Sequence, residues 1–162
     1  MLETIAKPRL LIVDDEVEVR GVLHDLLSDR YQCAEAASAE EALTQLREKN
    51  YELVISDITM SGMTGLEMIP HVKVASPDTV IVMISGMQTI ESAINALRLG
   101  AFDYLMKPFD LRQAEAAVAR ALEHHELVAA KRRYENHLEE LVEQRTAELD
   151  QALDSLENAY RT

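Results

Sequence analysis

Short apolar runs recur along the chain up to about Phe109, and they alternate with segments that have helical spacing. Continuous runs of Val, Ile and Leu are typical of strands in a parallel sheet that is covered on both faces. Their alternation with amphipathic segments predicts a doubly wound α/β fold with five strands. The predicted strands are 9–13, 31–36, 52–56, 79–84 and 102–106.

Three of the intervening segments have the apolar spacing of amphipathic helices. One of them opens with Ser38 as its N-cap, and Glu41 three residues later completes a capping box. Another closes at Gly100, a residue type that commonly ends helices. The three apolar faces consist of Val19, Val22, Leu23, Leu26 and Leu27, of Ala42, Leu43 and Leu46, and of Ile90, Ala93, Ile94 and Leu97.

Two of the predicted strands end in acidic residues. The stretch RLLIVDD ends in Asp14 and Asp15, and the stretch YELVISD ends in Asp57. Because ligands of open parallel sheets bind at the carboxyl ends of the strands, we expect these three carboxylates to meet at one edge. Carboxylates so close together repel one another unless a cation lies among them. Mg²⁺ binds few carboxylates and often completes its shell with phosphate oxygens, so the pattern predicts Mg²⁺ and a phosphoryl group.

Two further strands end in residues that suit a phosphoryl group. VIVMISG supplies the hydroxyl of Ser85, and FDYLMKPF supplies the ammonium of Lys107. Each residue also has an ordinary structural interpretation when it is considered alone. Asp14 could cap the next helix, Ser85 could belong to a turn, and Tyr104 could be a core residue. Only the spacing of all these residues together favours a phosphoryl-binding site.

In this order and spacing, the motifs LLIVDDE, VISDITMSGMTGLE, VMISG and DYLMKPF resemble the receiver domains of bacterial two-component response regulators. The resemblance covers about residues 7–125. It implies a flavodoxin-like sheet with strand order 2-1-3-4-5, Mg²⁺ as the cofactor and a sensor histidine kinase as the phosphodonor. It also implies that the chain is not an enzyme, beyond its own phosphorylation and autodephosphorylation.

The resemblance assigns roles to the acidic residues. Asp57 would be the phospho-acceptor, and it needs no general base because a carboxylate is already ionised. Asp15 would bind Mg²⁺ directly and Asp14 largely through water, with Asp57 and the backbone carbonyl of Thr59 as further ligands. Thr59 and Met87 would stand beside the phosphoryl group, where the family tunes hydrolysis. Met87 is apolar, which predicts slow hydrolysis of the acyl phosphate.

The resemblance also assigns the remaining polar residues. Lys107 would pair with the phosphoryl oxygens and with Asp57, and its bond to Pro108 is expected to be cis. Ser85 would donate a hydrogen bond to a phosphoryl oxygen. Tyr104 matches the aromatic switch residue that turns inward when this hydroxyl moves toward the phosphate.

From Leu111 to Thr162 the chain has no Gly or Pro, and its composition predicts one long helix. A heptad seam with a stutter at Arg145 indicates a parallel two-stranded coiled coil over 126–162, after a receiver domain at 1–125. The alternatives are a helix that folds back on its own domain and a frayed end. The seam consists of Leu138, Leu141, Arg145, Leu149, Leu153, Leu156 and Tyr160.

The tail also resembles connecting segments of larger regulators. LEELVEQRTAELDQAL is similar to signalling helices that join input and output domains, although Gln144 stands where that motif has an acid. LDSLENAYRT is similar to the segment that precedes HD-GYP phosphodiesterases of cyclic di-GMP, with a diguanylate cyclase or a histidine kinase as the alternative. We therefore expect a fragment of a larger regulator whose output domain lies outside this chain.

Composition narrows the function classes. With 16 basic and 29 acidic residues the formal net charge is −13, which argues against direct binding to nucleic acid or to anionic membranes. The single cysteine, Cys33, fits a cytoplasmic location. An aspartate-nucleophile phosphatase would need a second acid where Thr59 stands, and the segment VDDEVE lacks the glycines of a nucleotide-binding turn. A stand-alone phospho-shuttle and a pseudo-receiver that acts as an interaction module remain as alternatives.

Overall fold

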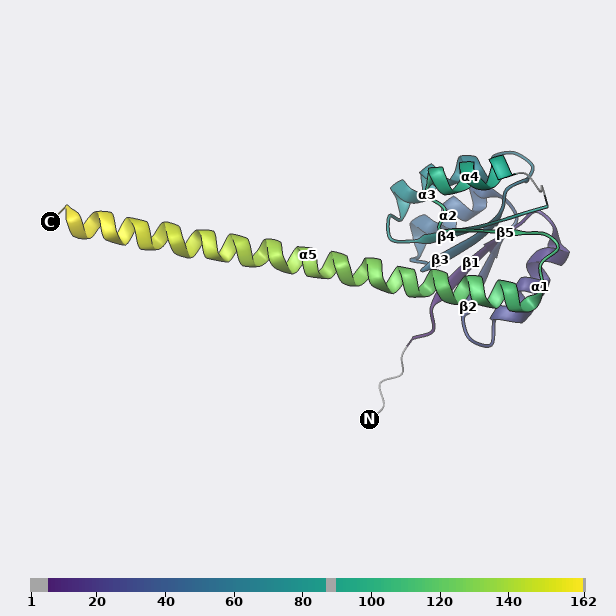
Figure 1. Ribbon diagram of the computed structural model, residues 1–162, viewed down its shortest axis with the longest axis horizontal. Coiled ribbons are helices and arrows are strands. Elements are labelled where there is room, and N and C mark those ends of the chain that lie inside the picture. Colours follow the sequence, from purple (N-terminus) through teal and green to yellow (C-terminus); the bar gives the residue numbers. More distant parts are fainter. Residues whose placement is uncertain (1–5, 87–89, 162) are drawn as a thin grey trace. The chain divides into compact units, whose positions relative to one another are not determined.

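The computed structural model describes residues 6–86 and 90–161, and Met87 lies outside the described residues. Strands and helices alternate along this part of the chain (Figure 1). The elements are β1 (Arg9–Val13), α1 (Val17–Leu27), β2 (Gln32–Ala36), α2 (Ala39–Glu48), β3 (Leu53–Asp57), α3 (Gly65–Ala75), β4 (Val80–Ser85), α4 (Ile90–Leu99), β5 (Asp103–Met106) and α5 (Leu111–Tyr160).

The five strands form one parallel sheet with the order β2-β1-β3-β4-β5, which confirms the predicted fold class. The register aligns the carboxyl ends of the central strands. Val13 of β1 pairs with Ser56 of β3, and Asp57 pairs with Ile84 of β4. The residues that the sequence places at the strand ends therefore lie at one edge of the sheet.

Each face of the sheet is covered by its own hydrophobic cluster, because successive strand residues point to opposite faces. Leu11 and Val13 belong to the cluster under α2, α3 and α4, whereas Leu10 and Ile12 belong to the cluster under α1 and the first turns of α5 (Figure 1). This two-sided burial explains why β1, β3 and β4 consist largely of apolar residues.

The predicted apolar faces differ in how they pack. Ala42, Leu43 and Leu46 of α2 are all buried, as are Leu23 and Leu27 of α1. In α4, however, Ala96 is the buried residue, and the apolar side chains of the predicted face are largely exposed. Alanine lets the α4 backbone approach the core closely, which turns the larger residues outward. The exposed side chains are Ile90 (81%), Ile94 (43%) and Leu97 (49%).

The capping box of α2 has a small variation. The Ser38 hydroxyl accepts a hydrogen bond from the Glu41 N–H at 3.1 Å, as predicted. The Glu41 carboxylate accepts from the N–H of Ala37, also at 3.1 Å, rather than from the N–H of Ser38 itself. The return bond thus holds the residue before the N-cap instead of the N-cap residue.

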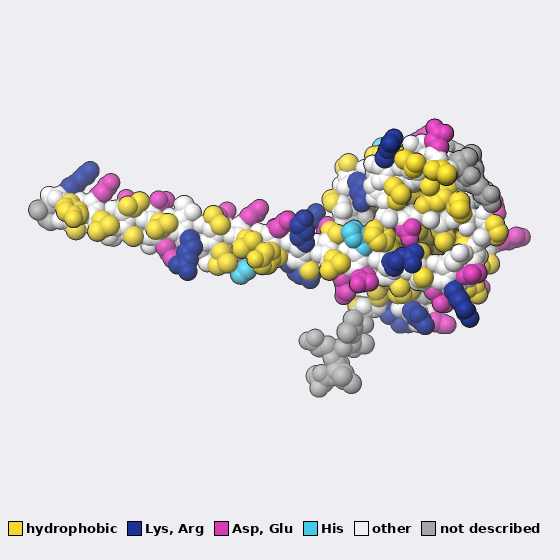
Figure 2. Space-filling model, viewed as in Figure 1, with side chains coloured by type: hydrophobic (Ala, Val, Ile, Leu, Met, Phe, Trp, Pro, Cys, Tyr) yellow, Lys and Arg dark blue, Asp and Glu magenta, His cyan; other side chains and the backbone are white. Residues whose placement is uncertain are grey.

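The contacts divide the chain into two units, Met1–Glu126 and Leu127–Thr162. Helix α5 is continuous from Leu111 to Tyr160, which confirms the predicted long helix. From Lys131 onward every described residue is exposed, including the apolar residues of the predicted seam, which recur along the helix (Figure 2). The coiled coil itself remains a prediction. Among the described residues no helix has both the length and the apolar character that a membrane span requires.

Gly65 allows α3 to start directly against the end of β3. A Cβ atom at this position would lie 2.2 Å from the backbone oxygen of Asp57 and 2.6 Å from Cε of Met83. The Gly65 N–H also donates to the carbonyl of Ile58 at 2.8 Å, so the backbone cannot withdraw without losing this bond.

We expect Gly65→Ala to lower the free energy of unfolding by about 1–3 kcal/mol, as overpacked core positions do. Gly21 of α1 is the matched control, because a Cβ there would meet no atom within 4 Å. Gly21→Ala should raise the free energy of unfolding by up to about 1 kcal/mol, since alanine favours helices. Urea unfolding of both variants tests this, and equal effects of the two substitutions would contradict it.

Candidate functional site

Three carboxylates meet at the carboxyl edge of the sheet. One oxygen from each of Asp14, Asp15 and Asp57 lies within 4.8 Å of the others. Asp14 and Asp57 are only 2% and 6% exposed, while Asp15 is exposed. Asp14 follows directly after Val13 of β1, whose partner Ser56 precedes Asp57, so the strand register alone brings these two residues side by side. The structure thus brings together the three side chains that the sequence proposed as metal ligands.

Lys107 brings a positive charge to this cluster. Its Nζ lies 3.2 Å from Oδ2 of Asp57 and 3.6 Å from Oδ2 of Asp14. Burial lowers the pKa of Lys107, but the hydrogen bond and the charge of Asp57 outweigh this effect, so the pKa is raised overall. Its backbone N–H donates to the Ser85 carbonyl at 2.8 Å, and its bond to Pro108 is cis, as expected.

Asp14 is the most buried of the three acidic residues. Its Oδ1 accepts a hydrogen bond from the N–H of Glu16 at 2.9 Å. Burial raises the pKa of the Asp14 carboxyl, and the negative charge of Asp57 raises it further, while the bond from Glu16 and the charge of Lys107 oppose the shift. The charged form of Asp14 is therefore disfavoured, and a cation among the carboxylates would relieve this cost.

Two backbone N–H groups of the loop between β3 and α3 donate hydrogen bonds to the acidic residues. The Thr59 N–H donates to Oδ1 of Asp57, and the Ser61 N–H donates to Oδ2 of Asp15, both at 3.3 Å. The first bond holds Thr59 beside the Asp57 carboxylate. The sequence predicts that the backbone carbonyl of Thr59 binds the metal. Oxygen-only ligands of this kind fit a hard cation such as Mg²⁺.

Glu40 helps to hold the loop between β3 and α3, and the sequence alone did not indicate this role. Its Oε1 accepts a hydrogen bond from the N–H of Met63 at 3.1 Å and so holds the far part of the same loop, beside Gly62 with its φ of +81°. Hydrogen bonds from its own N–H and from Met63 lower the pKa of Glu40. The acid in the first turn of a capped helix was visible in the sequence, but its partner is a backbone group 23 residues away.

Ser85 and Tyr104 lie on the neighbouring strands β4 and β5. Ser85 is fully buried at the end of β4, one residue after the partner of Asp57. Tyr104 is half-buried on β5, opposite Met83 of β4, and packs against the cluster that includes Ala101. Their predicted switch roles stay predictions, as does the effect of Met87 on hydrolysis.

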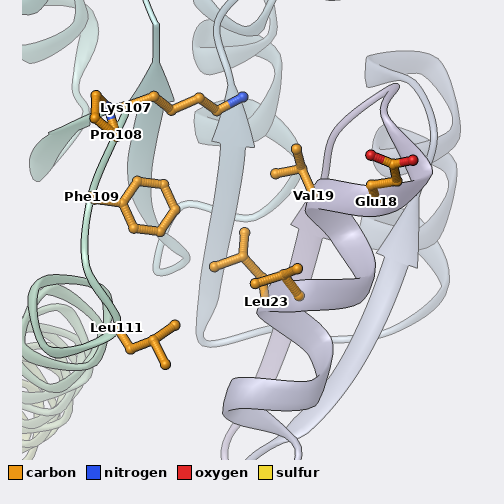
Figure 3. Close-up of a pocket in the computed structure, with 8 residues that line it drawn as sticks. Glu18, Val19, Leu23, Lys107, Pro108, Phe109 and Leu111 are labelled. Carbon is orange, nitrogen blue, oxygen red and sulfur yellow. The ribbon is translucent and has the colours of Figure 1, made fainter.

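A groove lies beside Lys107, between α1 and the segment that follows β5 (Figure 3). The phenyl ring of Phe109 points into it from one side, and Val19 and Leu23 of α1 line the other. Glu18, Val22, Pro108 and Leu111 complete the lining, so the groove is mainly apolar and has charged residues at its margin.

The comparisons with known proteins agree with this geometry. Residues 10–119 match the response regulator receiver domain family. The chain belongs to this family. It is 34% identical over 122 residues to the transcriptional regulatory protein ZraR of Escherichia coli O157:H7, an alignment that covers 75% of this chain and 28% of that protein. The chain spans about a quarter of the length of the curated relatives it matches.

Two solved receivers illustrate the similarity in structure. The CheY-like receiver domain protein of Methanospirillum hungatei JF-1 superimposes with a TM-score of 0.71 and 27% identity, covering 75% of this chain and 98% of that one. The signal receiver domain of an HD domain-containing protein from Pseudomonas fluorescens Pf-5 gives 0.74 and 26%, covering 80% and 97%. Receiver domains generally bind Mg²⁺ at an aspartate cluster, and this receiver domain has such a cluster.

We expect Asp14→Asn to stabilise the metal-free receiver domain at neutral pH, because it removes a buried charge that Asp57 repels. The pKa of Asp14 is raised on folding, so its contribution to stability is fully present below its ordinary pKa of 3.8 and is lost as pH rises through the raised value. The advantage of the variant should therefore grow from acidic to neutral pH.

Mg²⁺ should reverse the order of stability, because a metal ion bound at the aspartate cluster would stabilise the wild type and would stabilise Asp14→Asn much less. Asp25→Asn, which removes an exposed acid of α1, is the charge-matched control. Urea unfolding in EDTA and in Mg²⁺ measures the free energy of unfolding of each protein without and with the metal. Equal stabilisation of wild type and Asp14→Asn by Mg²⁺ would contradict a metal-binding role for Asp14.

Proposed function

We propose that this chain is a phospho-accepting receiver that takes its phosphoryl group from a sensor histidine kinase. The observation that carries the proposal is the position of the Asp57 carboxylate, 3.2 Å from the Lys107 ammonium and within reach of two other carboxylates. Strand β3 is central in the sheet, so a group on Asp57 has acids from β1 on one side and the ends of β4 and β5 on the other.

In the proposed reaction an oxygen of Asp57 attacks the phosphorus atom of a phosphohistidine. The P–N bond of the donor breaks, its electron pair leaves with the imidazole, and an acyl phosphate forms on Asp57. Lys107 offsets the charge on the phosphoryl oxygens, and the Ser85 hydroxyl binds one of them. Mg²⁺, when bound by Asp14, Asp15, Asp57 and the Thr59 carbonyl, would neutralise more of this charge.

The groove beside Lys107 supports a helical part of the kinase as the donor's docking element. Val19, Leu23 and Phe109 offer it an apolar face, and Lys107 connects this face to Asp57. An amphipathic helix that lies in such a groove uses apolar side chains at helical spacing.

Phosphorylation is tested with the purified chain, Mg²⁺ and acetyl phosphate, read by intact mass. We expect one added phosphoryl group, which Asp57→Asn loses. No phosphorylation of the wild type would overturn the phospho-acceptor and favour a pseudo-receiver that acts as an interaction module.

A companion variant separates docking from chemistry. Val22→Glu places a charge in the groove without touching the carboxylates, since Val22 is 56% exposed. Acetyl phosphate should phosphorylate this variant at the wild-type rate, whereas transfer from a phosphorylated histidine kinase that serves the wild type should slow at least tenfold. Equal slowing with both donors would contradict a docking role.

We further propose that residues 126–162 pair with a second copy as a parallel coiled coil that passes the signal to an output domain. The exposed leucines at heptad spacing support this pairing. The similarity to the receiver of an HD domain-containing protein supports an HD-GYP phosphodiesterase of cyclic di-GMP as the output. The similarity to ZraR makes a transcriptional output the second candidate.

The output is tested on the complete reading frame that contains this chain, by cyclic di-GMP hydrolysis with and without beryllofluoride. Absence of hydrolysis in both states would reject the HD-GYP output.

In this proposal the chain itself has no further enzymatic activity, binds no nucleic acid or membrane directly, and works in the cytoplasm. Its net charge of −13 supports the absence of nucleic-acid binding.

The dimer is tested by sedimentation of two charge-matched variants. Leu153→Glu places a charge in the proposed seam, whereas Gln151→Glu adds the same charge two residues away and off the seam. We expect the wild type and Gln151→Glu to be dimers and Leu153→Glu to be a monomer. A monomeric wild type would reject the coiled coil and favour a stand-alone phospho-shuttle.

A further inference from the structure

Arg20 is a largely buried cation on α1 that none of the roles above uses. Its Nη1 donates a hydrogen bond to the backbone carbonyl of Asp14 at 2.6 Å. Its Nε lies 3.4 Å from Oε1 of Glu35 on β2. The Arg20 side chain is only 14% exposed, whereas that of Glu35 is 38% exposed. The other oxygen of Glu35 lies 3.3 Å from Nδ1 of His24, so the Glu35 carboxylate has a contact on each oxygen.

The contact from Arg20 is one of several hydrogen bonds that hold Asp14 of the acidic cluster. The Asp14 N–H donates to the Ala36 carbonyl at 3.1 Å, and Oδ1 of Asp14 accepts from the Glu16 N–H. The carbonyl is the remaining backbone group of Asp14, and Arg20 is its donor. Asp14 is therefore held from β2 through its N–H and from α1 through its carbonyl.

The N-cap side chain of α1 does not stabilise this turn. Glu16 is the N-cap of α1, and its side chain makes no capping hydrogen bond. Asp14 lies beyond the last residue of β1, so the sheet fixes its N–H but not the direction of its carboxylate. The bond from Arg20 fixes the peptide that follows Asp14, and with it the turn that places the Asp14 and Asp15 side chains.

We propose that Arg20 is a positioning residue that sets the Mg²⁺ affinity of the aspartate cluster, with Glu35 as its anchor. This inference rests on the proposal that the cluster binds Mg²⁺. The action of Arg20 is geometric, because it contacts the backbone of Asp14 and its charge is paired with Glu35. Two different nitrogens of one planar guanidinium make the two contacts, and a single lysine ammonium cannot reproduce both.

The geometry gives a sharp test, because Arg20→Lys keeps the charge and removes the two-point contact. We expect Arg20→Lys and Arg20→Gln to weaken Mg²⁺ binding by about tenfold, as loss of a residue that orients metal ligands does. Arg30→Lys, at an exposed arginine outside the cluster, is the control and should bind like the wild type. The Mg²⁺ dissociation constant is measured from amide chemical shifts, with the fold verified on the same spectra.

Hydrogen exchange gives a second readout that needs no metal. In EDTA, loss of the Arg20 contact should speed exchange of the Glu16 amide, whose acceptor is Asp14, while the central strand amides keep their protection. A variant that loses stability everywhere but keeps the wild-type Mg²⁺ dissociation constant would show a structural role only and would overturn the proposal. Wild-type affinity in Arg20→Lys would overturn it as well.

The anchor is tested with Glu35→Ala and the double variant. If Glu35 acts through Arg20, Glu35→Ala should also weaken Mg²⁺ binding, and Arg20→Lys with Glu35→Ala should be no weaker than Arg20→Lys alone. Additive losses would reject Glu35 as the anchor. Absence of Mg²⁺ binding by the wild type would instead reject the proposed metal site, so the two failures are distinguishable.

Discussion

Repulsion among three carboxylates at one edge of the sheet is the constraint on which the site depends. At about 4.8 Å two unit charges repel by roughly 3–4 kcal/mol for an effective dielectric constant of about 20. Lys107 compensates one of the three charges, because it contacts both Asp57 and Asp14. The ionised cluster then keeps a formal charge of −2 (three carboxylates and one ammonium), which equals in size the charge of one divalent cation.

The fold tolerates this repulsion because the strands β1, β3 and β4 are largely apolar and buried, and they fix the strand ends that carry Asp14 and Asp57. The register between β1 and β3 brings Asp14 and Asp57 together, and the absence of a side chain at Gly65 lets α3 begin beside the backbone of Asp57. Burial on both faces provides the stability that offsets the repulsion. The core thus tolerates this net negative charge, and a cation bound among the carboxylates would neutralise it.

The sequence predicted the parts of the site that depend on strand ends. Asp14, Asp57, Ser85 and Lys107 each follow an apolar run, and a parallel sheet brings the ends of such runs to one edge without further information. Arg20 and Glu40 could not be found in this way. Their acceptor and donor are backbone groups, the carbonyl of Asp14 and the N–H of Met63, and no residue type in the sequence marks such a partner.

The packing of α4 is a part of the fold that the sequence could not predict. Helical spacing correctly indicated an apolar face, but it could not tell whether the sheet or solvent lies against that face. The choice depends on how closely the backbone approaches the core. Ala96 permits a close approach, so the small residue is buried and Ile90 is left 81% exposed. In α4 the spacing shows which residues share a face, but the close approach of the backbone at Ala96 decides which face is buried.

Side-chain size also separates the two parts of α5. Within the first unit the helix buries small residues, namely Ala114, Ala117, Val118 and Ala121. After Glu126 many of its larger apolar residues are exposed, among them Leu149 at 64% and Leu156 at 56%. Since burying one leucine contributes about 1.5–3 kcal/mol, the proposed pairing of residues 126–162 would gain its stability from leucines that are exposed in the single chain.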